Sequence, residues 1–136
     1  MSVRVLVVDD HELVREGIKV LLSQEDDLIV VGEAADGESA LARCRELVPD
    51  VVVLDLKLPG IDGLEVCRTL HAELPKVAVL MLTTFDDAEM VLSAVRAGAK
   101  GYVVKDVHSM DLKRSIRAVA RGEVAMDPKV MGHILH

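Results

Sequence analysis

The chain has almost no aromatic side chains: its 136 residues include one Tyr, one Phe and no Trp. Because 51% of the residues are nonetheless apolar, the core must consist of Val, Leu, Ile, Ala and Met. No run of about 18 apolar residues occurs, which excludes a helix that spans a membrane. The N-terminus passes directly into a strand pattern without the layout of a signal peptide, so we expect a cytoplasmic protein without membrane association.

Cysteine and positive charge are also scarce. Cys44 and Cys67 fall at apolar positions of expected helices and lack a C-x-x-C spacing, so we expect two reduced, buried thiols. The net charge of −7 argues against this chain binding nucleic acid unaided, because phosphate contacts need clustered Lys and Arg. The length corresponds to one domain that is large enough to bury a real core.

Apolar runs alternate with helical periodicity along most of the chain. Pro49, Gly98 and Gly122 are expected to end the second, fourth and fifth helices. Strict alternation of strands and helices predicts a parallel sheet that helices cover on both sides. The expected strands are residues 3–8, 28–35, 51–54, 77–82 and 101–104. The third, fourth and fifth helices are expected to be capped by Asp62 with Glu65, by Asp86 with Glu89, and by Ser109, respectively.

The stretch 123–136 differs from this pattern. It contains Asp127-Pro128 and then only a faint helical spacing of apolar residues. We therefore interpret residues 1–122 as one folded domain and residues 123–136 as the start of a linker toward a further domain.

Polar side chains follow four of the expected strands at the points where these strands end. Asp9 and Asp10 follow the first strand, and Asp55 follows the third. Thr83 follows the fourth strand and Lys105 the fifth. Because the ends of parallel strands share one edge of a sheet, we expect these five residues to converge there. Three clustered carboxylates repel one another, and a hard divalent cation such as Mg²⁺ would relieve that repulsion.

A carboxylate in such a site can attack a phosphoryl group. The transfer needs mainly positioning and neutralisation of the equatorial oxygens of the group. Mg²⁺ would take one oxygen, the Lys105 ammonium a second, and the Thr83 hydroxyl with backbone N–H groups the third. Asp55 lies at the end of a central strand, before a Pro-Gly turn, and is the expected nucleophile. Aspartyl phosphate is a known product of carboxylate nucleophiles.

These motifs together resemble the receiver domain of bacterial two-component response regulators, over residues from about 3 to 122. The stretches 11–17, 83–85 and 97–106 resemble the NarL/FixJ (LuxR-type) subfamily in particular. The residues that carry the wider resemblance are Asp9, Asp10, Asp55, the Leu-Pro-x-x-Asp-Gly loop at 58–63, Thr83 and Lys105.

The resemblance implies an α/β, flavodoxin-like (CheY-like) doubly wound fold with five parallel strands in the order 2-1-3-4-5 and five helices. It also implies that a sensor histidine kinase phosphorylates Asp55. Mg²⁺ would be held by Asp10, Asp55 and the backbone carbonyl of Lys57, with Asp9 assisting through water. Such a chain is a phosphoacceptor and not a conventional enzyme.

In this family two positions govern signalling. Thr83 would move toward the phosphoryl group, and Tyr102 would change its rotamer, which remodels the face made by the fourth helix and fifth strand. The implied result is a phosphorylation-dependent homodimer that controls transcription. DNA would be bound by a C-terminal helix-turn-helix domain beyond His136.

Some of these residues have simpler interpretations. Thr84 competes with Thr83, although register with the family favours Thr83. Tyr102 is equally well explained as core packing. His11 lies next to the acids and could ligate a metal. We instead expect an exposed residue in the first turn of a helix, because no second His or Cys has ligand spacing to it.

Other functions are less well supported. A Mg²⁺-dependent phosphatase or phosphotransferase would commonly carry its nucleophile in an Asp-x-Asp motif on the first strand and would need a substrate lid, and the sequence has neither. A phosphorylation-independent interaction module would be favoured by a missing site residue, and none is missing. A stand-alone receiver that acts on a protein partner is the alternative to a transcription factor.

Overall fold

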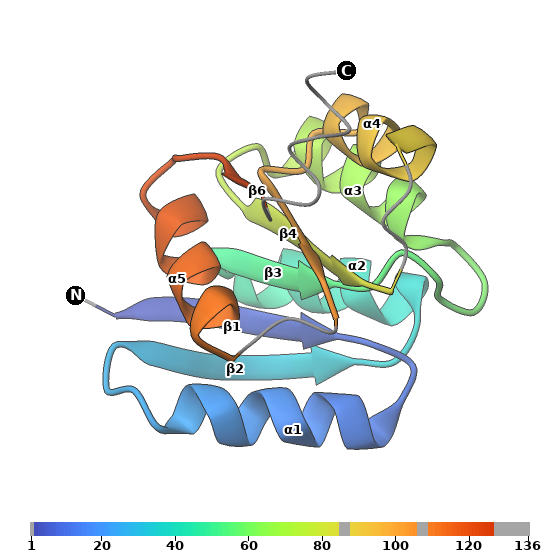
Figure 1. Cartoon of the computed structure of the whole chain (residues 1–136). Coiled ribbons are helices and arrows are strands. Elements are labelled where there is room, and N and C mark those ends of the chain that lie inside the picture. The colour runs from blue at the N-terminus through green and yellow to red at the C-terminus, as the bar shows by residue number, and fades with distance from the viewer. Residues whose placement is uncertain (1, 85–87, 106–108, 127–136) are drawn as a thin grey trace.

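The computed structural model describes residues 2–84, 88–105 and 109–126. A parallel sheet lies at the centre, with helices packed against both of its faces (Figure 1). Strands and helices alternate as the sequence predicts. The strands are β1 (Val3–Val8), β2 (Leu28–Ala34), β3 (Val51–Leu54), β4 (Ala78–Thr83), β5 (Gly101–Val104) and β6 (Ala125–Met126), and the helices are α1 (Glu12–Ser23), α2 (Gly37–Leu47), α3 (Gly63–Glu73), α4 (Ala88–Arg96) and α5 (Ser109–Ala120).

The described part of the sheet has six strands in the order β2-β1-β3-β4-β5-β6, one more than the expected five. The order of the first five is the predicted one. β6 pairs in parallel with β5, and the Ala125 N–H donates to the Lys100 carbonyl at 2.9 Å. Gly101 permits this approach, because a Cβ there would lie 2.8 Å from the Ala125 carbonyl oxygen. The sequence expectation assigned residues 123–126 to a linker, since a strand of two residues shows no alternation of its own.

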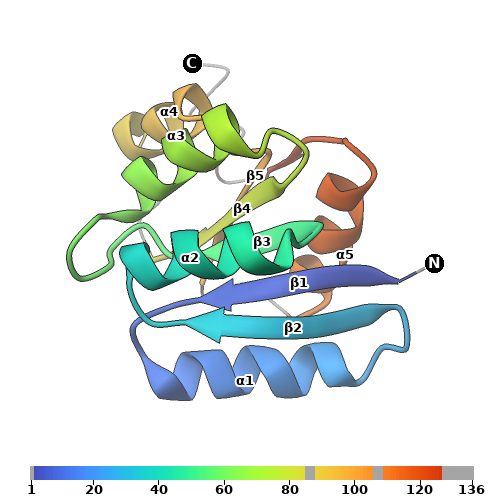
Figure 2. The same cartoon turned by 180° about the vertical axis from the view of Figure 1, so that it is seen from behind.

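The sheet separates two apolar layers, and this explains why its strands are apolar almost throughout. Val5 and Val7 of β1 pack in the layer of α1 and α5, whereas Leu6 and Val8 pack in the layer of α2, α3 and α4. Seen from behind, α2 and α3 cover the face that lies opposite α5 (Figure 2). The alternation along one strand therefore fills both layers.

The helix ends largely follow the sequence signals. Asp62 caps α3 by accepting a hydrogen bond from the Glu65 N–H at 3.0 Å, but the Glu65 carboxylate pairs with Arg68 instead of completing a reciprocal cap. Gly98 and Gly122 follow α4 and α5 with φ of 105° and 85°, values that favour glycine. Helix α5 begins at Ser109, so this residue is the first helical residue and not the capping residue before the helix. Asp86 lies outside the described residues, as does the stretch 127–136.

Both cysteines are buried and unpaired, as expected. Burial raises the pKa of the Cys44 and Cys67 thiols to about 12, because a thiolate is poorly solvated in an apolar layer. Among the described residues, no helix combines the length and the apolar composition that crossing a bilayer requires.

Candidate functional site

The backbone brings the polar residues of the sequence analysis to one edge of the sheet. The Asp9 N–H donates to the Ala34 carbonyl and the Asp55 N–H to the Val8 carbonyl, each at 3.1 Å. These bonds continue the strand pairing by one residue at the ends of β1 and β3. Asp9 and Asp55 are therefore placed side by side by the sheet and not by a mobile loop.

The Lys105 ammonium lies between these two acids, 2.8 Å from Asp9 Oδ2 and 3.0 Å from Asp55 Oδ2. Asp9 is only 2% exposed and Asp55 only 6%. Lys105 follows β5 directly, and its N–H donates to the Thr83 carbonyl of β4 at 2.7 Å. Four strands thus build the contact between one cation and two buried carboxylates, which the sequence predicts from their shared sheet edge.

The two carboxyls differ in pKa because their surroundings differ. Burial raises the pKa of Asp9, but hydrogen bonds from Lys105 and from the His11 N–H outweigh it and hold the pKa below its usual value. In Asp55 burial prevails over the Lys105 contact, and the pKa is raised. Burial also lowers the pKa of Lys105, yet the two carboxylates more than compensate and raise it. The cation therefore stays charged between the acids.

Asp10 and His11 extend this pair into an acidic cluster that opens to solvent. One ligand atom from each of Asp9, Asp10, His11 and Asp55 lies within 4.8 Å of the others. Asp9 and Asp55 form its buried wall, and Asp10 and His11 its exposed side. An oxygen-rich site with an open side suits Mg²⁺, which takes few protein ligands and keeps several waters. The residues present therefore fit a hard divalent cation.

His11 is an exposed residue at the start of α1, as expected, but it also joins the cluster. Its side chain is 66% exposed, and its Nδ1 lies 3.0 Å from Asp9 Oδ1 and 3.1 Å from Asp10 Oδ1. The sequence analysis placed the residue on the helix and did not predict this contact. The direction of the ring depends on how the chain leaves β1, which residue spacing alone does not reveal.

The remaining predicted residues differ in burial and in their relation to the acids. Thr83 is fully buried at the end of β4, whereas Thr84 is exposed, which favours Thr83 as the residue that belongs to the site. The exposed Lys57 follows Asp55 by two residues, and its backbone N–H hydrogen-bonds the Asp55 carboxylate. Tyr102 lies fully buried in β5, in the apolar layer of α2, α3 and α4.

Arg15 is a neighbour of the site that the sequence analysis missed. Its Nη1 donates to the Asp9 carbonyl at 2.7 Å, and its Nε donates to Glu33 Oε1 at 2.8 Å. The only sequence signal is its place in the stretch 11–17, which contributes to the subfamily resemblance. The side chain thus reaches from α1 back to the end of β1 and to β2.

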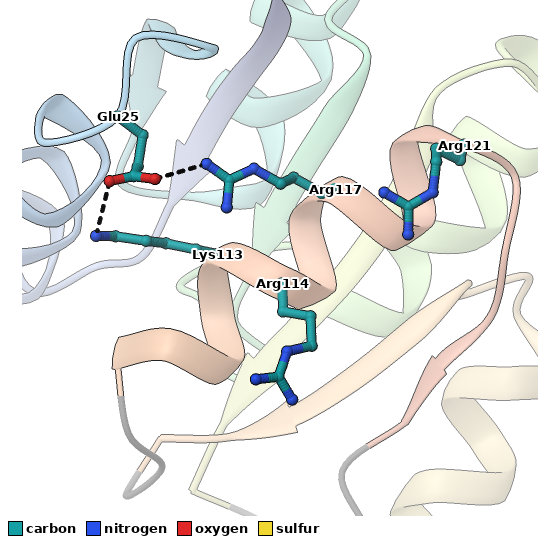
Figure 3. A pocket seen from close by; sticks show the side chains of 5 residues that line it. All are labelled: Glu25, Lys113, Arg114, Arg117 and Arg121. Carbon is teal, nitrogen blue, oxygen red and sulfur yellow. Dashed lines mark hydrogen bonds and ion pairs between the residues drawn. The ribbon is translucent and has the colours of Figure 1, made fainter.

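A second polar cluster, also missed, lines a hollow beside α5 (Figure 3). Lys113 and Arg117 contact Glu25 at 3.5 and 2.7 Å, and Arg117 also contacts Asp27 at 2.8 Å. Arg114 and Arg121 line the same hollow. The cluster ties α5 to the connection between α1 and β2, so its evident role is structural.

Comparison with known proteins places this site in a family. The response regulator receiver domain family matches residues 5–117. The response regulator protein VraR of Staphylococcus aureus (strain N315) is 40% identical over 131 residues, which are 96% of this chain and 63% of VraR. The chain thus spans less than two thirds of the length of such curated relatives.

Solved structures agree with this assignment. A two-component response regulator of the LuxR family from Aurantimonas sp. SI85-9A1 has a TM-score of 0.95 and 37% identity, covering 99% of this chain and 96% of that one. A DNA-binding response regulator of the LuxR family from Staphylococcus aureus has a TM-score of 0.82 and 25% identity, covering 87% and 98%. The chain belongs to the response regulator receiver family and is a receiver domain of the NarL/LuxR type.

Proposed function

We propose that the chain accepts a phosphoryl group on Asp55 from a sensor histidine kinase in a Mg²⁺-dependent reaction. The observation that carries the proposal is the Lys105 ammonium between the buried Asp9 and Asp55, in an acidic cluster whose other members, Asp10 and His11, are exposed. Such a site combines a nucleophile, a fixed cation and room for a divalent metal, which are the parts that phosphoryl transfer needs.

The surroundings favour Asp55 as the nucleophile over its two neighbours. Both oxygens of Asp9 are engaged, Oδ1 by the His11 N–H at 2.9 Å and Oδ2 by Lys105 at 2.8 Å. The lowered pKa of Asp9 also makes it the weaker base, whereas the pKa of Asp55 is raised. Asp10 is exposed at the rim of the cluster. Asp55 is therefore the more basic of the two buried carboxylates.

The residues around Asp55 would have different roles in phosphoryl transfer. An Asp55 oxygen forms a bond to phosphorus while the bond from phosphorus to the donor breaks, and the donor leaves with its electron pair. Lys105 would neutralise one equatorial oxygen of the transferring group, and the Thr83 hydroxyl would hold another. Asp10, Asp55 and the Lys57 backbone carbonyl would hold Mg²⁺, with Asp9 assisting through water, and the bound ion would supply further charge neutralisation.

The signal would leave the site through Thr83 and Tyr102. Thr83 lies at the end of β4, and Tyr102 lies in β5, fully buried against the α4 side of the sheet. A change in the Tyr102 rotamer therefore requires the packing between α4 and β5 to change. This supports coupling between the site and an outer face, where phosphorylation would promote a homodimer.

The output would lie outside this chain. We infer a receiver domain that extends beyond the expected boundary at residue 122 to include β6 (Ala125–Met126). A linker and a DNA-binding helix-turn-helix domain would follow it in a cytoplasmic transcription regulator. The net charge of −7 supports the assignment of DNA binding to another domain. The chain would be a phosphoacceptor that assists its own modification and not a conventional enzyme.

The test is the intact mass of the chain after incubation with acetyl phosphate and Mg²⁺. We expect one added phosphoryl group on the parent and none on Asp55→Asn or after Mg²⁺ is chelated. Asp26→Asn, which changes an exposed acid away from the cluster, is the matched control and should still gain the group. An adduct that persists in Asp55→Asn, or that forms equally without Mg²⁺, contradicts the proposal.

A further inference from the structure

Arg15 connects three elements at the rim of the acidic cluster. It lies in the second turn of α1, and its side chain is only 15% exposed. One end of the guanidinium donates to the Asp9 carbonyl at 2.7 Å, while its Nε donates to Glu33 of β2 at 2.8 Å. The side chain therefore fixes the position of the chain just where β1 ends and the acidic residues begin.

The Asp9 carbonyl needs such a donor. Strand pairing of β1 ends at Val8, and Asp9 adds only the bond from its N–H to the Ala34 carbonyl. Beyond that point the backbone turns toward α1, and within the described residues the donor to the Asp9 carbonyl is Arg15. Because Asp9 is almost fully buried, its carbonyl has little access to water. A buried carbonyl without a donor is costly, so Arg15 stabilises one orientation of this peptide group.

A register shift in β2 determines the position of Glu33, the acidic partner of Arg15. Val5 pairs with Val30 but Leu6 pairs with Gly32, so β2 carries one extra residue at Val31. As a result Glu33 lies beside Val7, whose side chain faces the α1 layer. Without the extra residue Glu33 would pair with Val8 and point to the opposite layer. The shift thus brings the Glu33 carboxylate to Arg15, where it also binds Lys19 at 2.6 Å.

We propose that Arg15 is a positioning residue for cation binding. By holding the Asp9 carbonyl it fixes the peptide between Asp9 and Asp10, and so the direction in which the Asp10 carboxylate leaves the chain. The inference rests on the proposed function, in which Asp10 is a metal ligand. Glu33 pairs with the guanidinium charge, so Arg15 acts through geometry. Loss of a partner that orients a metal ligand typically weakens metal affinity about 10-fold to 100-fold.

The experiment compares Arg15→Met with Lys19→Met. Both variants remove one cation from Glu33, but only Arg15→Met removes the donor to the Asp9 carbonyl. The Kd for Mg²⁺ is measured by calorimetry, together with unfolding in urea. We expect Arg15→Met to weaken Mg²⁺ binding about 10-fold. Lys19→Met should remain within about twofold of the parent, because it leaves the orientation of the peptide unchanged.

A spectroscopic measurement separates positioning from general loosening of the fold. In the metal-free state, the amide signals of Asp10 and His11 should shift in Arg15→Met, while those of α5 should not. Arg15→Lys keeps the charge but has one ammonium to serve two acceptors, so its Mg²⁺ affinity should lie between those of the parent and Arg15→Met. If Arg15→Met does not fold, the Mg²⁺ affinity of Arg15→Lys tests the inference in its place.

Two results overturn the inference: an unchanged Kd for Mg²⁺ in both Arg15 variants, or an equal loss of affinity in Lys19→Met. The second result would show that charge near Glu33 matters and that the contact with the Asp9 carbonyl does not. Failure of the proposed function is distinguishable, because the parent itself would then bind no Mg²⁺ and gain no phosphoryl group on Asp55.

Discussion

At the scale of single residues, two buried acids share one cation. Lys105 contacts Asp9 and Asp55, and each acid also accepts a backbone N–H, from His11 and Lys57 respectively, but only in Asp55 does burial outweigh these contacts. The pKa of Asp9 is lowered and that of Asp55 is raised. Ionised Asp55 is therefore the less stabilised of the two in the metal-free chain. Ionising such a carboxyl costs free energy in the metal-free chain. Binding a metal or modifying the carboxylate would offset its negative charge and remove that cost.

This difference predicts that Asp55→Asn stabilises the metal-free chain at pH 7. A carboxyl whose folded pKa is raised lowers stability above that pKa and has no effect below its unfolded value, here 3.8. The gain in the free energy of unfolding should therefore shrink as the pH falls toward 3.8. Urea unfolding between pH 7 and pH 3.5 measures it, with Asp26→Asn as control. A gain that is the same at every pH contradicts the interpretation.

The backbone behind Asp55 leaves no room for a side chain at Gly63. A Cβ there would overlap the Asp55 carbonyl oxygen and lie 2.8 Å from Leu56 Cα, and neither can move aside without shifting the nucleophile. Gly63→Ala should lower the free energy of unfolding by about 2 kcal/mol. Gly17→Ala, in a helix with nothing within 4 Å of its Cβ, should raise it by about 1 kcal/mol. Urea unfolding of both variants measures these changes in the free energy of unfolding. Changes of the same sign would refute the close-packing argument.

At the scale of elements, α5 is tied to the connection between α1 and β2. Arg117 contacts both Glu25 and Asp27, and Lys113 contacts Glu25 from one turn earlier in the helix (Figure 3). The hydrogen bond from Arg117 is the largest cause of the lowered pKa in each of these acids. The ion pairs thus hold together two segments that are distant in the sequence.

Arg117→Met should destabilise the chain in a pH-dependent way. Acids with lowered folded pKa values contribute stability above their unfolded values, here 4.5 and 3.8, and lose it as the pH falls. The difference between parent and variant in urea unfolding should therefore be largest at pH 7 and shrink by pH 3. Arg114→Met is the control, since Arg114 lines the same hollow without an ion pair among the described residues. A difference that grows on acidification would contradict this role.

Prediction from the sequence succeeded where a residue pattern by itself determines the structure. The apolar runs of β1 and β3 require a sheet covered on both faces, and parallel strands bring Asp9, Asp55 and Lys105 to one edge. β6 was missed because its two residues become a strand only by pairing with β5. The contact of Arg15 with Glu33 could not be predicted, since it depends on a register shift in β2 that leaves no mark in local composition.

At the scale of the whole molecule, the proposed function assigns the switch to this chain and the output to a domain outside it. Apolar layers cover the two faces of the sheet that carries the acidic edge, and the family match covers residues 5–117. The chain covers 63% of the length of VraR, which leaves room in such relatives for a further domain. This division supports the proposal that a phosphoryl group bound at the sheet edge controls a domain outside this chain.

Locating the phosphoryl group within the intact chain tests the assignment of Asp55 most directly. After incubation with acetyl phosphate and Mg²⁺, reduction with borohydride converts a phosphorylated aspartate to homoserine, which peptide mass spectrometry then locates. We predict homoserine at Asp55 and at no other acid of the cluster. Homoserine at Asp9 or Asp10 in the parent chain would contradict the proposed nucleophile, and so would a phosphorylated chain that contains no homoserine.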